Sequence, residues 1–389
     1  MIERVAFLSV HTSPLAAPGS GDAGGMNVYV DSVARTFAAM GIAVDVFTAR
    51  VDDGFGEETE VAPGYRVLHI EAPGRDRAER IGAFAQGVAA WAIRHQANYD
   101  IVHSHYWLSA WAGVLLEEPL QAPLVISFHT LGRVRDVGAG EPPPPLLRLA
   151  AETEVVARAG CIVASTPAEA ADLMEHYAAR PERVCVSPPG VDHGLFHPGA
   201  VRRSDLGLSE GPLAAVVGRV QPLKGIDVAI EAVSGIPDAR LVVVGGPSGE
   251  VGDREQEHLT RLADDLAPGR VDFLPPMSHD TVADLYRSVD VVLIPSRAES
   301  FGLVAVEAQA CGTPVVASRV GGLAFSVADG ESGYLVDGDH VADWTKRVSE
   351  ILTDDVVRAK LSAGAIVHSS GFSWNVTAAR LLELYQGLV

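Results

Sequence analysis

The stretch Pro295-Ser-Arg-Ala-Glu-Ser-Phe-Gly-Leu-Val-Ala-Val-Glu-Ala-Gln-Ala-Cys-Gly-Thr-Pro314 decides which fold this sequence predicts. The apolar run Val289–Ile294 precedes it and predicts a parallel strand that is buried on both faces. We expect Ser300 to cap a helix whose apolar positions recur at helical spacing until Gly312 ends it. Unpaired N–H groups at such a helix start carry partial positive charge, which suits a diphosphate.

Two carboxylates accompany this helix. Glu299 lies just outside its start, and Glu307 is expected two turns inside it. In a chain with 50 acidic residues, a charged solvent face explains such a pair equally well. The position of Glu299 at the carboxyl end of a strand favours a functional role, because open α/β sheets bind ligands there.

Length and composition limit the class of protein. A chain of 389 residues with 48% hydrophobic content predicts two soluble α/β domains. No segment reaches the ~20 apolar residues of a membrane span. The first eleven residues are too short and too acidic for a signal peptide, so we expect a cytoplasmic protein. The net charge of −20 argues against nucleic acid as a partner.

The cysteines and lysines are both few. Cys161, Cys185 and Cys311 are too widely spaced for a disulfide framework or a zinc pattern, and we expect buried thiols. Only three of the 30 basic residues are lysine. One of them, Lys224, follows Arg219 closely, and an ammonium beside a planar guanidinium suits a phosphate site.

Strand and helix patterns alternate along the chain, which predicts parallel sheets and doubly wound, Rossmann-like domains. A Pro/Gly-rich segment, 188–199, separates two such alternations. The sequence therefore predicts domains over 1–195 and 196–370 that face a central cleft. The remaining segment, 371–389, is amphipathic, and it predicts either a plain packing helix or a helix crossing back to the first domain.

Polar residues follow several strands of the first domain. A Gly-rich loop between His11 and Asn27 is either a connector or a backbone that approaches a ligand closely. His11, His105 and His129 each lie just past a predicted strand. One such histidine is more often structural, but three at one sheet edge favour a cleft.

The motifs Gly218-Arg219…Lys224-Gly225, Glu299…Glu307 and Gly321-Gly322 resemble those of the retaining GT-B glycosyltransferases of family 4. His103-Ser-His-Tyr-Trp-Leu-Ser109 and the Gly-rich loop are similar to the branch of that family that acts in mycothiol biosynthesis. That branch transfers N-acetylglucosamine from UDP-N-acetylglucosamine to D-inositol 3-phosphate. The resemblance covers essentially the whole chain and implies a GT-B fold.

The resemblance also implies roles for individual residues. It implies catalytic roles for His129, Glu299, Arg219 and Lys224. It implies that the donor is bound by Gly25, Arg219, Lys224, Met277, Glu299, Ser300, Phe301, Gly302, Leu303 and Glu307. It implies that the acceptor is bound by His11, Asp22, Ala23, Gly24, Gly25, Met26, Asn27, Tyr106, Thr130 and Arg148. No cofactor is implied for catalysis, but a structural magnesium would lie on main-chain oxygens of Tyr286, Arg287, Val289 and Thr313.

The chain departs from the family in its acceptor region. The family carries a lysine for the inositol phosphate after the third strand, whereas the segment 71–81 holds Arg75, Arg77 and Arg80 and no lysine. Inositol phosphate leads slightly over an unphosphorylated acceptor such as ergothioneine, used with a GDP-octose donor in lincosamide biosynthesis. A sugar-nucleotide epimerase and a non-catalytic nucleotide-sugar binder are alternatives of other classes. The sequence leaves the oligomeric state open, with a homodimer as one arrangement.

Overall fold

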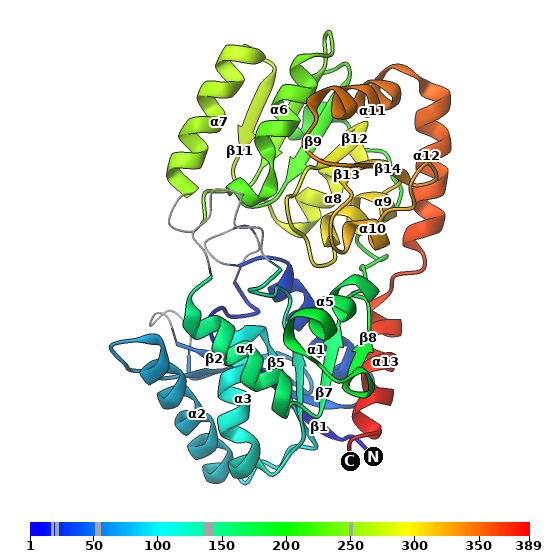
Figure 1. The fold of residues 1–389 in the computed structure, drawn as a ribbon. Coiled ribbons are helices and arrows are strands. Elements are labelled where there is room, and N and C mark those ends of the chain that lie inside the picture. The colour runs from blue at the N-terminus through cyan, green and yellow to red at the C-terminus, as the bar shows by residue number, and fades with distance from the viewer. Residues whose placement is uncertain (17–18, 20–22, 51–55, 135–143, 249–251) are drawn as a thin grey trace.

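The computed structural model describes residues 1–16, 19, 23–50, 56–134, 144–248 and 252–389. Two lobes each contain one sheet flanked by helices (Figure 1). The α/β class predicted from the sequence, with two doubly wound domains, is confirmed.

The first domain is built on an eight-stranded sheet of order β3-β4-β2-β1-β5-β6-β7-β8 in the described chain. Its strands run parallel except β3, which forms an antiparallel pair with β4. The strands are β1 (Arg4–Leu8), β2 (Ala43–Ala49), β3 (Glu58–Ala62), β4 (Tyr65–Ile70), β5 (Ile101–His105), β6 (Leu124–Ser127), β7 (Cys161–Ala164) and β8 (Val184–Val186). The helices are α1 (Gly25–Ala39), α2 (Arg77–Arg94), α3 (Tyr106–Leu120), α4 (Leu146–Arg158) and α5 (Pro167–Tyr177).

The second domain is built on a six-stranded parallel sheet of order β11-β10-β9-β12-β13-β14 in the described chain. Its strands are β9 (Leu213–Val217), β10 (Arg240–Val244), β11 (Val271–Leu274), β12 (Val291–Ile294), β13 (Val315–Ser318) and β14 (Gly333–Val336). Its helices are α6 (Ile226–Ser234), α7 (Gly252–Leu266), α8 (His279–Ser288), α9 (Leu303–Ala310), α10 (Leu323–Ser326), α11 (Val341–Thr353) and α12 (Asp355–Ser369). Short 3-10 turns occur at Pro181–Arg183, Arg203–Leu206 and Pro222–Lys224.

The sheets are covered on both faces, which explains the apolar runs in the sequence. In β1, Val5 and Phe7 belong to one buried cluster, and Ala6 and Leu8 belong to another on the opposite face. The strand β12 lies inside the second sheet and is buried along its whole length. Parallel strands buried in this way read as continuous Val, Leu and Ile.

The start of α9 differs from the prediction. Its N-cap is Gly302, not Ser300, and Gly302 has a φ of 94°, a left-handed conformation that favours glycine. A Cβ on Gly302 would lie 2.6 Å from Leu323, so the close packing also requires glycine. Because the helix begins at Leu303, Glu307 lies just over one turn inside it rather than two.

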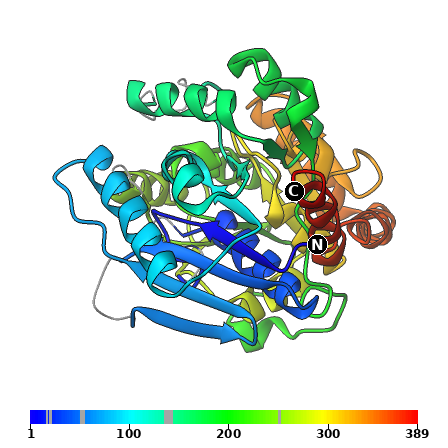
Figure 2. The same ribbon diagram turned by 90° about the horizontal axis from the view of Figure 1, so that it is seen from below.

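A last helix, α13 (Trp374–Gln386), packs beside α1 of the first domain, which brings the two chain ends together (Figures 1 and 2). Leu381 and Tyr385 of this helix are fully buried in an apolar cluster of the first domain. We propose domain limits of 1–195 and 196–370, with 371–389 as the returning helix. The limits at 195 and 370 both fall outside helices and strands.

The two segments that cross between the domains are joined to each other. A parallel bridge links Val191 to Ser373. The Thr377 hydroxyl donates to the carbonyl of Pro188 at 2.7 Å, and the His193 ring contacts the carbonyl of Phe372 at 2.9 Å. The domains are therefore connected by a pair of crossings rather than by two independent linkers.

Two expectations from composition can be compared with the structure. The three cysteines are free thiols; Cys161 and Cys311 are buried, whereas Cys185 is partly exposed. Among the described helices, none is long and apolar enough to cross a membrane.

Candidate functional site

A cleft of about 1220 Å³ lies between the domains and is lined by both. The first domain contributes residues that follow β1, β5 and β6, and the second contributes residues that follow β9 and β12. These are carboxyl ends of parallel strands, the edge at which open α/β sheets bind ligands.

The second domain lines the cleft with cations. The Lys224 ammonium lies 2.6 Å from a carboxylate oxygen of Glu299, and both side chains are partly exposed. Arg219 also lines the cleft, and its guanidinium lies 3.5 Å from the hydroxyl of Ser248. The cation pair predicted from the sequence is therefore brought together with Glu299 at one wall.

The backbone before α9 completes this wall. The N–H groups of Leu303 and Val304 begin the helix, where no earlier helical carbonyl can accept them. The preceding loop rests on two glycines: a Cβ on Gly321 would lie 2.2 Å from the carbonyl of Glu299, and Gly322 donates to that carbonyl at 2.8 Å. Phe301, Gly302 and Met277, also predicted for the donor, line the same cleft.

Glu307 lies deeper in this wall. It is buried, and burial raises the pKa of its carboxyl to about 7 while a hydrogen bond from the Tyr286 hydroxyl opposes that shift. The Tyr286 hydroxyl lies 3.3 Å from a Glu307 oxygen. A carboxyl with such a pKa can accept a hydrogen bond from a sugar hydroxyl and can change protonation near neutral pH.

The first domain places Arg148, Tyr106 and Thr130 in one contact group. Nη2 of Arg148 donates to the carbonyl of Thr130 at 2.9 Å and to its hydroxyl at 3.1 Å. Nη1 of Arg148 lies 3.4 Å from the Tyr106 hydroxyl, and the guanidinium lies 5.2 Å from the centre of the Tyr106 ring. All three residues line the cleft, so three predicted acceptor residues, which follow β5 and β6 or begin α4, are brought together.

The three histidines lie at the same sheet edge. Nδ1 of His105 lies 3.1 Å from Nε2 of His129, and the ring of His11 lies 4.6 Å from the ring of Tyr106. Burial lowers the pKa of His129 to about 3, so this ring is neutral at pH 7. The backbone of His129 has a φ of 61°, and its carbonyl accepts a hydrogen bond from the Ser300 hydroxyl of the second domain.

The Gly-rich loop reaches across the cleft. A Cβ on Gly24 would lie 3.6 Å from Nε of Arg219, and a Cβ on Gly25 would lie 3.3 Å from Leu303. His11, Gly24, Gly25 and Met26 line the cleft, whereas Ala23 and Asn27 do not. The Asn27 amide instead holds the loop, accepting from Gly24 at 3.0 Å and donating to the Thr12 hydroxyl at 2.9 Å. Asp22, predicted for the acceptor, lies outside the described residues.

The family is established by comparison with known proteins. Residues 23–195 match the model described as Glycosyltransferase Family 4, and residues 202–367 match Glycosyl transferases group 1. A D-inositol 3-phosphate glycosyltransferase of Actinosynnema mirum is 45% identical, with 99% of this chain and 97% of that protein covered. The chain is a family 4 glycosyltransferase. A D-inositol 3-phosphate glycosyltransferase of Mycolicibacterium smegmatis is also 45% identical, over 98% of this chain and 90% of that protein.

Solved structures show that this glycosyltransferase has the predicted GT-B fold. A sucrose-phosphate synthase from Thermosynechococcus elongatus has a TM-score of 0.93 at 31% identity, with 99% of each chain covered. Anabaena HepE, solved with UDP and glucose, has a TM-score of 0.80 at 18% identity, covering 99% of this chain and 100% of that one. At that identity the second likeness concerns the fold alone.

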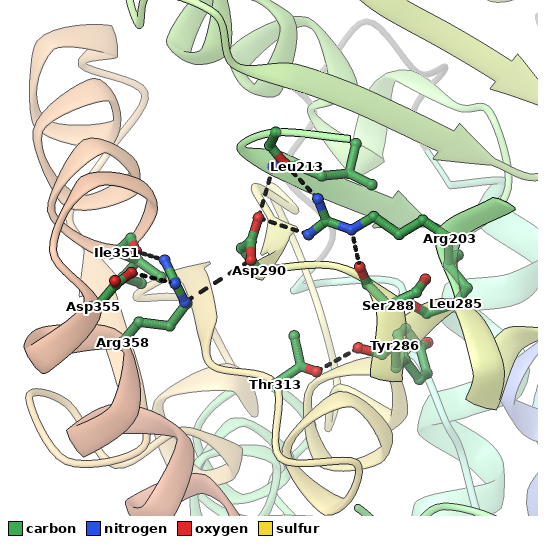
Figure 3. A network of polar contacts seen from close by, with 11 residues as sticks. Arg203, Leu213, Leu285, Tyr286, Ser288, Asp290, Thr313, Ile351, Asp355 and Arg358 are labelled. Carbon is green, nitrogen blue, oxygen red and sulfur yellow. Dashed lines mark hydrogen bonds and ion pairs between the residues drawn. The ribbon is translucent and has the colours of Figure 1, made fainter. Parts of the chain in front are cut away.

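The magnesium implied by the resemblance would lie at the end of α8. The last carbonyls of a helix carry partial negative charge and are oxygen ligands that suit a hard cation. The Tyr286 carbonyl accepts from the Thr313 hydroxyl, and nearby Nε of Arg203 donates to the carbonyl of Ser288 at 2.7 Å (Figure 3). The structure thus brings Tyr286 and Thr313 together, and the ion itself stays a prediction. In the described chain no three His, Cys, Asp or Glu side chains gather as a metal site.

Glu152 and Tyr177 were missed by the sequence analysis. Glu152 lies on α4, four residues after Arg148, and is fully buried. Nε of Arg148 lies 2.7 Å from Oε1 of Glu152. The spacing of Arg148 and Glu152 is visible in the sequence, but it is equally typical of an exposed helical ion pair. Only the burial of both residues distinguishes this pair.

Proposed function

We propose that this glycosyltransferase transfers N-acetylglucosamine from UDP-N-acetylglucosamine to inositol phosphate, with retention at the anomeric carbon, in the cytoplasm. The observation that carries the proposal is a single cleft with two facing walls. Arg219 and Lys224 lie on one wall, and Arg148, Tyr106 and Thr130 lie on the other. Full-length relatives at 45% identity are D-inositol 3-phosphate glycosyltransferases, which supports the acceptor.

On the donor side, the proposed chemistry is the departure of a diphosphate. Arg219, Lys224 and the first residues of α9 line the cleft, and we propose that their N–H groups stabilise the negative charge that develops on the diphosphate. The bond between the anomeric carbon and the phosphate oxygen breaks as the bond to the acceptor oxygen forms. The departing phosphate oxygen takes the acceptor proton on the same face of the sugar, which gives retention.

On the acceptor side, the free cations favour an anionic substrate. Arg77 and Arg80 line the cleft, and neither side chain forms an ion pair or hydrogen bond with a described residue. Arg75, which precedes the N-cap of α2, is held by Glu79 at 2.8 Å and does not line the cleft. We propose that Arg77 and Arg80 serve a phosphorylated acceptor in place of the family's lysine.

A ligand panel tests the function directly. We expect thermal stabilisation by UDP and by inositol phosphate, because a ligand that binds the folded state stabilises it by mass action. We also expect sugar transfer only when donor and acceptor are both present, with the anomeric configuration of the product read by NMR. Turnover of the nucleotide sugar alone would identify an epimerase. Stabilisation by GDP and ergothioneine instead would identify a glycosyltransferase of the type used in lincosamide biosynthesis.

The acceptor assignment has its own matched variants. The double change Arg77→Ala and Arg80→Ala should raise the KM for inositol phosphate about tenfold or more, since a charge-assisted hydrogen bond contributes about 1.5–3 kcal/mol. Arg75→Ala, two residues before Arg77 and outside the cleft, should leave this KM unchanged. Equal effects of both variants would contradict the assignment.

A further inference from the structure

We infer that Glu152 is a positioning residue for the acceptor, acting through Arg148 and through the turn that follows β6. The inference rests on the proposed function and identifies a residue outside the cleft on which acceptor binding depends. Glu152 is fully buried and does not line the cleft, so it acts only through the residues it holds.

Both oxygens of the Glu152 carboxylate accept hydrogen bonds. One oxygen accepts from Nε of Arg148 at 2.7 Å, and the other accepts from the Tyr177 hydroxyl. The backbone N–H of Gly132 is shared between the two oxygens, at 3.2 and 3.1 Å. All of these groups are donors, so the charged carboxylate, which only accepts, suits this position better than an amide does.

Glu152 fixes the orientation of the Arg148 guanidinium. The guanidinium is planar, and Glu152 holds its Nε edge. Its two terminal nitrogens are thereby directed to Tyr106 and Thr130, at 3.4 Å and 2.9–3.1 Å. A guanidinium held in this way can present its remaining Nη1 N–H to a ligand with little further loss of side-chain freedom.

The turn after β6 is held by the same carboxylate. A Cβ on Gly132 would lie 2.9 Å from an oxygen of Glu152, so glycine lets the backbone approach the carboxylate. Tyr177, from α5, donates to Glu152 and accepts from the N–H of Arg133 at 2.9 Å. Burial raises the pKa of the Tyr177 hydroxyl, which keeps it protonated as a donor. The segment 130–133, which carries Thr130, is therefore anchored at Gly132 and Arg133.

The pairing also determines how Arg148 can contribute. The charge of Glu152 offsets that of Arg148, so the guanidinium offers directed hydrogen bonds more than net charge. Net positive charge for an anionic acceptor then comes from Arg77 and Arg80, which have no acidic partner among the described residues.

A matched pair on one helix tests the inference. Glu152→Gln removes the charge of the buried pair, and Glu154→Gln removes that of the exposed pair with Arg158, which has the same spacing and the same 2.7 Å distance. Glu152→Gln should raise the KM for inositol phosphate about tenfold or more while kcat and the donor KM change less than about twofold. Glu154→Gln should leave all three unchanged. Glu152→Asp, which retains the charge, should recover part of the loss.

A second measurement separates positioning from general stability. In an Arg148→Lys background, Glu152→Gln should raise the acceptor KM much less than in the wild type, because the two residues act as a unit. Tyr177→Phe, which keeps the ion pair, serves if Glu152→Gln does not fold, and it should raise the acceptor KM alone. This inference alone would be overturned if Glu152→Gln and Glu154→Gln had equal acceptor KM values. It would also be overturned if Glu152→Gln raised the donor KM as much as the acceptor KM. A wild-type enzyme that does not use inositol phosphate would overturn the proposed function, and with it this role.

Discussion

Lys224 is held in place by Glu299 before any ligand arrives, with 2.6 Å between the ammonium and a carboxylate oxygen. Both side chains are about a quarter exposed, so solvent screens the pair, and its contribution to stability is small. Under the proposed function, the pair would order the site, because a diphosphate would meet a lysine whose rotamer Glu299 has already selected.

Replacing Lys224 by Ala should weaken UDP binding by about 10- to 150-fold, the effect of losing one charge-assisted hydrogen bond of about 1.5–3 kcal/mol. Uridine, which lacks phosphates, and inositol phosphate should bind as before. Calorimetry with the three ligands measures this, and Lys346→Ala, at an exposed lysine of α11, is the control. Equal loss for uridine and UDP would show that Lys224 does not serve the diphosphate.

Glu307 gives the second domain a pH-dependent stability. Its folded pKa of about 7 exceeds the ordinary 4.5, so the folded state binds a proton more tightly than the unfolded state does. The stabilisation is complete below about pH 4.5 and is lost as pH rises through about 7, up to about 3 kcal/mol in all. Glu307→Gln should therefore become more stable relative to the wild type as pH rises.

Urea unfolding at several pH values between about 5 and 8 measures this difference. The exposed Glu257→Gln variant on α7 should show no such trend. A difference between Glu307→Gln and the wild type that is constant with pH would mean that Glu307 ionises normally.

At the scale of elements, the sequence predicts those limits of helices and strands that are determined by the residues next to them. The strand predicted at Val289–Ile294 is observed as β12 (Val291–Ile294), because an apolar run that ends before Pro295 marks it. The predicted start of α9 was wrong. Ser300 satisfies the local rule for an N-cap, but its hydroxyl donates a hydrogen bond to the carbonyl of His129, 171 positions away. Glu152 was missed for the same reason, since burial depends on the whole fold.

The returning helix α13 offers a test at this scale. Leu381 is fully buried in the first domain, whereas Val376 on the same helix is 62% exposed. Leu381→Ala should cost about 2–5 kcal/mol by leaving a cavity, and Val376→Ala should cost little. Thermal unfolding measures both. Equal effects would mean that α13 does not stabilise the first domain through this apolar contact.

At the scale of the molecule, a hydrogen bond joins the two sides of the cleft: the Ser300 hydroxyl donates to the carbonyl of His129. A residue of the second domain and a residue of the first domain are thereby connected across the cleft. A lid or domain motion in such an enzyme must make and break this contact. The contact thus favours the arrangement of the two domains in which Ser300 and His129 meet.

Ser300→Ala should shift the molecule toward a more open form. Small-angle scattering should then show a larger radius of gyration for the ligand-free variant than for the wild type, and UDP should reduce the difference. Ser204→Ala, at an exposed serine of the second domain, should scatter like the wild type. Identical profiles for both variants, with and without UDP, would mean that this contact does not govern closure.

The joined crossings at Val191 and Ser373 have a consequence for how the enzyme can be divided. A protease that nicks only one of these segments leaves the lobes attached through the other, so a cut there need not release a fragment. Excising the second domain as a recombinant piece requires two new chain ends at adjacent points, and circular permutation at either crossing retains the remaining tether.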